Sequence, residues 1–174
     1  MKNILVMMAL IFSMGASAAL TAEQKTALDK QIEMVKGWAS NATIVAAVKA
    51  GAGADYATMT QDTWKALPVL DPKVRSLSKT PAAELLKKNK SEAVSEAFLN
   101  AADGTKVALL SKTSSWSHKG KAKHDDPMAG KTWIGDVEMD ESTGAQQIQI
   151  AVPVMDAGKA VGSLCVGFTV SKLK

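Results

Sequence analysis

The sequence contains a single cysteine, Cys165, so the chain cannot form an internal disulfide bond. Its stability must therefore come from packing, even in an oxidising compartment. The net charge is only +4, which is too small to indicate a nucleic-acid partner. Enzyme signatures are missing as well: there is no Gly-x-Ser-x-Gly, and the Ser-x-x-Lys pattern at Ser76–Lys79 has no Lys-Thr-Gly partner. These absences favour a binding protein over an enzyme.

Long apolar runs are missing except at the N-terminus. Lys2 precedes an apolar run at residues 4–12, and the small residues Ala16-Ser17-Ala18 follow it. The run is far shorter than the roughly 20 residues needed to span a bilayer, and its ending is typical of a cleaved secretory signal. We therefore predict a signal peptide at residues 1–18, a single domain at residues 19–174, and a periplasmic location.

Helical periodicity is strongest directly after the predicted signal peptide. Thr21 and Gln24 have the spacing of a capping box, and apolar residues then recur at helical intervals from Leu28 to Val45. Gly51 ends the pattern. This predicts one long N-terminal helix. Three shorter helices are expected after residues that can cap them, namely Thr60, Asp71 and Thr80.

Alternating patterns in the second half of the chain predict five strands. Ala93–Leu99 and Thr105–Ser111 flank an Asp103-Gly104 turn, and Trp133–Val170 contains three further alternating runs joined by two tight turns. We expect each of these three runs to aim one apolar row at a common core. The rows are Trp133, Gly135, Val137 and Met139; Ile148, Ile150, Val152 and Val154; and Gly162, Leu164, Val166, Phe168 and Val170. The element order predicts an α+β fold in which helices cover an antiparallel sheet.

The loop between the second and third predicted strands, residues 111–132, concentrates residues suited to ligand binding. A loop of this length without structure of its own is unusual and often functional. We predict an apolar wall from Trp116 and Trp133, with Asp136 on the rim of the pocket. Cationic side chains would bind a carboxylate group of the ligand, and acidic side chains would bind its amine. The predicted carboxylate-binding residues are His118, Lys119, Lys121 and His124, and the predicted amine-binding residues are Asp125 and Asp126.

Three alternatives remain open from these residues. His118 and His124 could bind a metal ion or haem, because neutral imidazole is a common ligand, although their six-residue spacing matches no recognised motif. The loop could instead be solvated and mobile, its lysines serving only solubility. The domain could also be a purely structural partner-binding module, which a wide exposed apolar patch would favour.

Several segments resemble the extracytoplasmic PAS-like sensor domains of the Cache class. These segments are residues 38–49, 98–104, 136–143 and 152–164. The resemblance implies a five-stranded antiparallel sheet with a long N-terminal helix on one face and a loop-covered pocket on the other. It also implies that Trp116 takes the place of a ligand-binding aromatic residue and that Asp125-Asp126 corresponds to a displaced acidic pair. The implied function is recognition of a small metabolite, an organic acid or amino acid, with no cofactor and with a membrane-bound receptor or sensor kinase as partner.

Overall fold

The structure is a computed structural model that describes residues 19–139 and 144–174. The predicted signal peptide lies outside the described residues, and so does most of the turn expected between the third and fourth strands. Within the described part of the chain, no helix is both long enough and apolar enough to cross a membrane.

The N-terminal helical region consists of two helices, so the prediction of one continuous helix was wrong. Helix α1 (Ala22–Ala39) begins at the predicted capping box between Thr21 and Gln24. It ends at Ser40, and the side chain of Asn41 then accepts a hydrogen bond from the amide of Thr43 to start α2 (Ala42–Ala50). Asn is among the strongest N-capping residues, and this explains the break inside an otherwise periodic segment.

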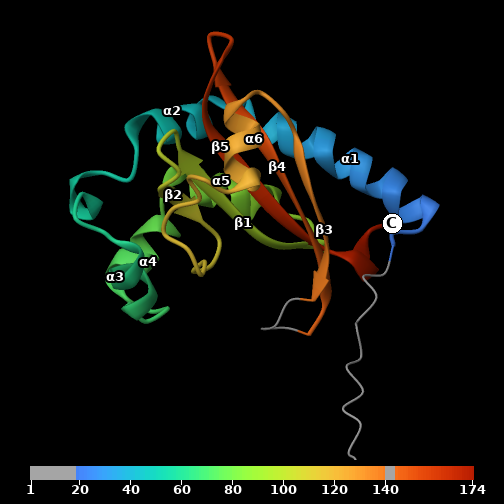
Figure 1. Cartoon of the computed structure of the whole chain (residues 1–174), viewed down its shortest axis with the longest axis horizontal. Coiled ribbons are helices and arrows are strands. Elements are labelled where there is room, and N and C mark those ends of the chain that lie inside the picture. Colours follow the sequence, from blue (N-terminus) through green and yellow to red (C-terminus); the bar gives the residue numbers. More distant parts are fainter. Residues whose placement is uncertain (1–18, 140–143) are drawn as a thin grey trace, which may run out of the picture.

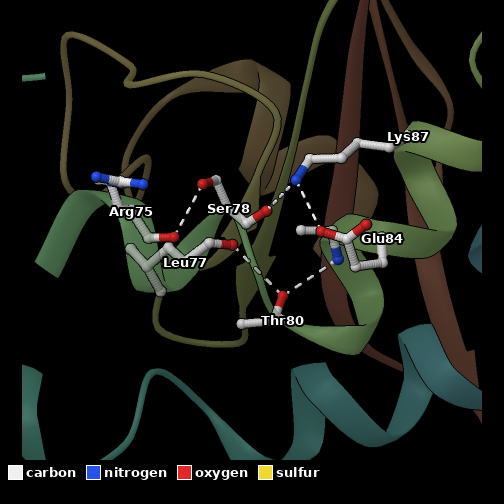
Figure 2. Close-up of polar contacts among 7 residues, drawn as sticks. Arg75, Leu77, Ser78, Thr80, Glu84 and Lys87 are labelled. Atoms are coloured by element: carbon white, nitrogen blue, oxygen red, sulfur yellow. Dashed lines mark hydrogen bonds and ion pairs between the residues drawn. The ribbon is translucent and has the colours of Figure 1, made fainter. Parts of the chain in front are cut away.

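Short helices follow, each beginning at a capping residue predicted from the sequence. After a 3₁₀ turn, η1 (Ala54–Tyr56), come α3 (Gln61–Ala66), α4 (Pro72–Leu77) and α5 (Pro81–Asn89). Figure 2 shows the connection between α4 and α5, where Thr80 accepts from the Ala83 amide at 3.1 Å. Lys87 of α5 donates to the carbonyl of Ser78 at the end of α4 and pairs with Glu84 at 2.8 Å, so its side chain links the two helices.

The sheet has five antiparallel strands, as predicted. The strands are β1 (Val94–Ala101), β2 (Lys106–Leu109), β3 (Trp133–Met139), β4 (Gln146–Asp156) and β5 (Lys159–Thr169), and a 3₁₀ turn, η2 (Val170–Lys172), follows them. Their order across the sheet is β2-β1-β5-β4-β3. The first hairpin therefore lies beside the last strand of the closing meander, and β2 and β3 form the two edges (Figure 1).

One face of the sheet packs against α1 and α2 and holds the larger core (Figure 1). The predicted inward rows of β4 and β5 are confirmed, since their apolar residues are buried here. These residues are Ile148, Ile150, Val152, Val154, Leu164, Val166 and Phe168. The row predicted for β3 was wrong. The pairing register shifts between Ile134 and Val137, so Trp133 packs with the opposite face of the sheet, Val137 packs with the α1 face, and Met139 is 59% exposed.

The loop predicted to lack structure contains a sixth helix, α6 (Ala122–Met128), which corrects that expectation. Figure 1 shows α6 crossing β4 and β5 on the face opposite to α1. Its buried residues His124 and Pro127 are three positions apart and therefore share the side of the helix that faces the sheet. The histidine-bearing segment is thus partly folded onto the sheet rather than suspended over it.

Candidate ligand-binding cleft

The face opposite to α1 is divided into a packed part and an open part. The packed part is a second core built around Trp64 and Trp116, whose ring centroids lie 5.2 Å apart. Trp64 Nε1 donates to the Thr113 carbonyl at 2.7 Å, and the side chain of Gln61 bonds both the Ser114 carbonyl and the Trp116 amide. Helix α3 therefore anchors the start of the loop between β2 and β3.

The open part is a cleft of about 1320 Å³ over the end of the sheet where β1 and β4 begin and β5 ends. Glu96 and Phe98 of β1 and Gln147 and Gln149 of β4 form its floor. One wall comes from β3, one from the loop at residues 111–114, and one from His118 and α6. The cleft is large enough for a metabolite-sized ligand and combines aromatic with polar groups, as ligand sites do.

A chain of hydrogen bonds crosses the floor. The carboxylate of Glu96 accepts from the side-chain amides of both Gln147, at 2.6 Å, and Gln149. Ser95 Oγ donates to Gln147 Oε1 at 2.8 Å, and Lys123 Nζ of α6 donates to Gln149 Oε1 at 2.5 Å. The side-chain amide of each glutamine is therefore held in one orientation, in which its NH₂ group donates to the Glu96 carboxylate.

Charges of both signs line the cleft in equal number among the described residues. The lysines are Lys90, Lys112, Lys123 and Lys172, and the acids are Glu92, Glu96, Asp136 and Glu138. Lys123 also lies over the Trp133 ring, 5.8 Å from its centroid. A balanced lining of this kind suits a ligand that itself carries both charges better than a strongly charged anion.

His118 reaches the cleft because the segment before α6 follows the edge of β2. Thr105 and Ser117 form an isolated antiparallel bridge, and the His118 amide donates to the Gly104 carbonyl at 2.9 Å. Gly104 has φ +82°, and a Cβ built on it would lie 2.4 Å from the backbone nitrogen of Lys119. Only glycine combines this backbone conformation with so close an approach, so the Asp103-Gly104 turn also places the histidine.

Behind His118 lies a buried lysine, Lys106, with 0% exposure. Its ammonium group donates to Asn100 Oδ1 at 2.7 Å and contacts His118 Nδ1. The Phe98 ring stacks on His118 at 4.9 Å between centroids and lies 4.5 Å from Lys106 Nζ. Burial lowers the pKa of Lys106 to about 7, and burial together with the neighbouring Lys106 lowers the pKa of His118 to about 2.

The second histidine belongs to the same buried polar group but lies away from the cleft. His124 Nδ1 is 2.8 Å from Ser163 Oγ, and its Nε2 is 3.4 Å from the Ala102 carbonyl. Ser163 in turn accepts from Asn100 Nδ2 at 2.9 Å. Burial lowers the pKa of His124, so the imidazole is neutral at physiological pH and ties α6 to the sheet.

The structure distributes the residues predicted for the site over several environments. His118, Trp133 and Asp136 line the cleft. The remaining predicted residues do not line it. Trp116 is in the aromatic core, and His124 is on the side of α6 that faces the sheet. Lys119 and Lys121 are exposed, Asp125 accepts from the Gly120 amide at 3.1 Å, and Asp126 is half-buried on α6.

Sequence reasoning missed Glu96, Lys106, Lys123, Gln147 and Gln149. One signal was present: Gln147 and Gln149 alternate with the buried Ile148 and Ile150, and a polar row opposite an apolar row marks a strand face that is open to solvent or to a cleft. Nothing in the sequence distinguishes Lys106 from a solvent-facing strand lysine, because its burial depends on the stacking of Phe98 and His118.

The arrangement of the two histidines does not favour the metal alternative. Nδ1 of His118 contacts an amine, and both ring nitrogens of His124 lie within hydrogen-bonding distance of protein oxygens. Across residues 19–139 and 144–174, no three His, Cys, Asp or Glu side chains are grouped closely enough to hold a metal ion.

No protein-family model and no curated protein matches the sequence. Solved structures do match. One is the ligand-binding domain of the Pseudomonas aeruginosa amino acid chemoreceptor PctC in complex with GABA, with 16% identity and a TM-score of 0.50 over 87% of this chain and 58% of that one. Others are the ligand-binding domain of the Campylobacter jejuni chemoreceptor Tlp3 with 4-methylisoleucine (15% identity, TM-score 0.44, 88% and 62% covered) and the Vibrio cholerae histidine kinase DctB sensor domain (14%, 0.42, 86% and 58%).

The PctC comparison, together with the sheet and its flanking helices, shows that the chain has the Cache-type, PAS-like sensor-domain fold that the sequence resemblance predicted. The chain spans about three-fifths of the length of these solved domains.

Proposed function

We propose that this chain is an extracytoplasmic sensor module that binds a small metabolite, an amino acid or an organic acid, in the cleft. The observation that carries the proposal is the cleft floor, where Glu96 is held by two oriented glutamines beside the aromatic rings of Phe98 and Trp133. An ammonium group would bind Glu96, and a carboxylate would bind Lys123 or His118 on the facing wall. Trp133 and Phe98 would cover the apolar part of the ligand.

The similarity in fold supports a binding role, because the PctC domain is described as an amino acid chemoreceptor domain in complex with GABA. We further propose that ligand binding is communicated to a membrane-bound receptor or sensor kinase. The module would bind its ligand and transmit the signal without chemical turnover.

A thermal-shift screen tests the proposal directly. The full chain is scanned with α-amino acids, γ-aminobutyrate, and mono- and dicarboxylates. A ligand present at a hundred times its Kd stabilises the native state by about 2.7 kcal/mol, which gives a clear rise in Tm. If no member of either class raises Tm at millimolar concentration, the proposed ligand class is wrong.

Glu96→Gln provides the specific variant, because it keeps the shape of the side chain while removing its charge. We expect it to weaken an amino-acid ligand at least tenfold. The matched control is Glu23→Gln on the first turn of α1, an exposed residue that does not line the cleft, and it should leave the affinity unchanged. Equal effects of the two substitutions on affinity would show that Glu96 does not contact the ligand.

A further inference from the structure

Lys106 is a buried lysine without a counter-ion among the described residues. All the ion pairs within 4.0 Å in the described chain are between other residues, namely Lys36–Glu33, Lys49–Asp156 and Lys87–Glu84. The nearby thiol of Cys165 cannot serve, because burial raises its pKa to about 12. Buried charges in proteins are normally paired or are neutralised by a shifted pKa, so an anion bound beside Lys106 would supply the partner that the described residues lack.

The orientation of His118 connects this charge to the cleft. A protonated lysine has only donors, so Nδ1 of His118 must accept from Lys106 and the ring proton must reside on Nε2. No described residue bonds Nε2. The fully buried side-chain atoms without a partner in the described chain are Gln31 Oε1 and Ser91 Oγ, so Nε2 of His118 retains access to the cleft that the residue lines.

We propose, building on the function above, that His118 and Lys106 form a proton-linked anion subsite. Nε2–H of His118 donates to a carboxylate oxygen of the ligand, and the ammonium of Lys106 behind the ring supplies the counter-charge. When Lys106 loses its proton, the subsite loses both the charge and the constraint that keeps the ring proton on Nε2. The ligand carboxylate is therefore bound together with one proton.

The groups around Lys106 are consistent with this coupling. The charge of Glu96 on β1 raises the pKa of Lys106. The charges of Lys121, just before α6, and of Lys123, within α6, lower it. His118, His124 and Cys165 are the other titratable groups nearby, and all three are neutral near pH 7. The pKa of Lys106, lowered by burial to about 7, places its titration within the physiological range. A bound carboxylate would raise that pKa, which by linkage makes affinity depend on pH.

The test uses acetate as the probe and NMR of the full chain with ¹⁵N-labelled histidine. The chain has two histidines, so the ring signals of His118 are readily assigned by comparison with His118→Gln. At pH 6 we expect acetate to shift the ring nitrogens of His118 and not those of His124. Above pH 7 the Kd for acetate should rise by up to tenfold per pH unit.

Lys106→Met keeps the length and the apolar part of the side chain and removes the charge. We expect it to weaken acetate at pH 6 by at least tenfold and to abolish the dependence of Kd on pH. Lys30→Met, an exposed substitution on α1, is the matched control and should behave as the wild type. If Lys106→Met fails to fold, the pH dependence of the wild-type Kd still decides the matter.

The inference is overturned if acetate leaves the His118 ring unchanged, or if its Kd is the same at pH 6 and pH 8.5. Failure of this inference is distinguishable from failure of the proposed function. Metabolites that bind in the screen with an affinity independent of pH and of Lys106 would leave the sensor role standing. Proton-linked acetate binding, with no binding of any amino acid or larger carboxylate in the screen, would support the subsite and leave the sensor role without a metabolite ligand.

Discussion

The indole of Trp116 stacks on the phenol ring of Tyr56, with centroids 5.4 Å apart and ring planes 16° from parallel. This contact, together with the Trp64 ring 5.2 Å away, makes Trp116 a core residue with 4% exposure. We expect Trp116→Ala to lower the free energy of unfolding by about 3–5 kcal/mol, as is typical for deleting a buried aromatic side chain. Urea denaturation measures this directly, and a loss below about 1 kcal/mol would contradict the core assignment.

Trp133 is the contrasting case, since it lines the cleft and lies beneath Lys123 at 5.8 Å. Its ring folds over Gly135, where an added Cβ would be 2.6 Å from the indole. We expect Trp133→Ala to reduce ligand affinity tenfold or more while lowering stability less than Trp116→Ala does. Thermal shift with and without ligand separates the two effects. Equal losses of stability in both variants would assign Trp133 to the core as well.

The larger features of the fold were predictable because they depend on local signals. The caps at Thr21, Thr60 and Thr80 and the alternation in β4 and β5 are properties of neighbouring residues, and the structure confirms them. The break at Asn41 was visible as a capping residue but was outweighed by the continuous apolar stripe.

The cleft could be predicted only in part, because its residues are brought together by long-range pairing. Glu96 meets Gln149 because both pair with Gly167 of β5, which lies between them in the sheet, and no local pattern reveals that relation. The prediction that residues 111–132 form the ligand-binding loop treated their charge and aromatic content as markers of the site. In the structure α6 and Trp116 use much of that content for packing.

Lys106 makes stability depend on pH in a specific direction. Its pKa is lowered from 10.5 to about 7 in the folded state, so between these values the unfolded chain binds a proton that the folded chain does not. Stability therefore rises with pH through that window, by at most about 1.4 kcal/mol per pH unit, and is insensitive to this group below pH 7. We expect the unfolding free energy of the wild type minus that of Lys106→Met to increase from pH 7 to pH 10. A constant difference would show that the lysine is not desolvated.

Lys119 and Lys123 offer a matched pair on one segment. The Lys123 ammonium lies in the cleft on Gln149, whereas Lys119 is exposed and outside it. We expect Lys123→Met to weaken a carboxylate ligand by about 1.5–3 kcal/mol, the range for losing a hydrogen bond to a charged group, and Lys119→Met to leave its affinity unchanged. Isothermal titration at low and high salt measures both. A larger loss of affinity in Lys119→Met than in Lys123→Met would show that the ligand binds at the exposed part of the loop.

Gly104 links the first hairpin to the position of His118. Substitution by alanine imposes a strained backbone at φ +82° and drives a Cβ to 2.4 Å from the Lys119 backbone. Gly158, at φ +80°, has no atom within 4 Å of the position that an added Cβ would take, so Gly158→Ala carries the backbone strain of roughly 1–2 kcal/mol without the clash. We expect Gly104→Ala to be the more destabilising of the two and to shift the ring ¹⁵N signals of His118. Because residues 117–119 are held to the turn by the Gly104 carbonyl, a displaced segment would carry the histidine out of the cleft wall. If the His118 signals were instead unchanged in Gly104→Ala, the histidine would have to be held by Phe98 and Lys106 alone.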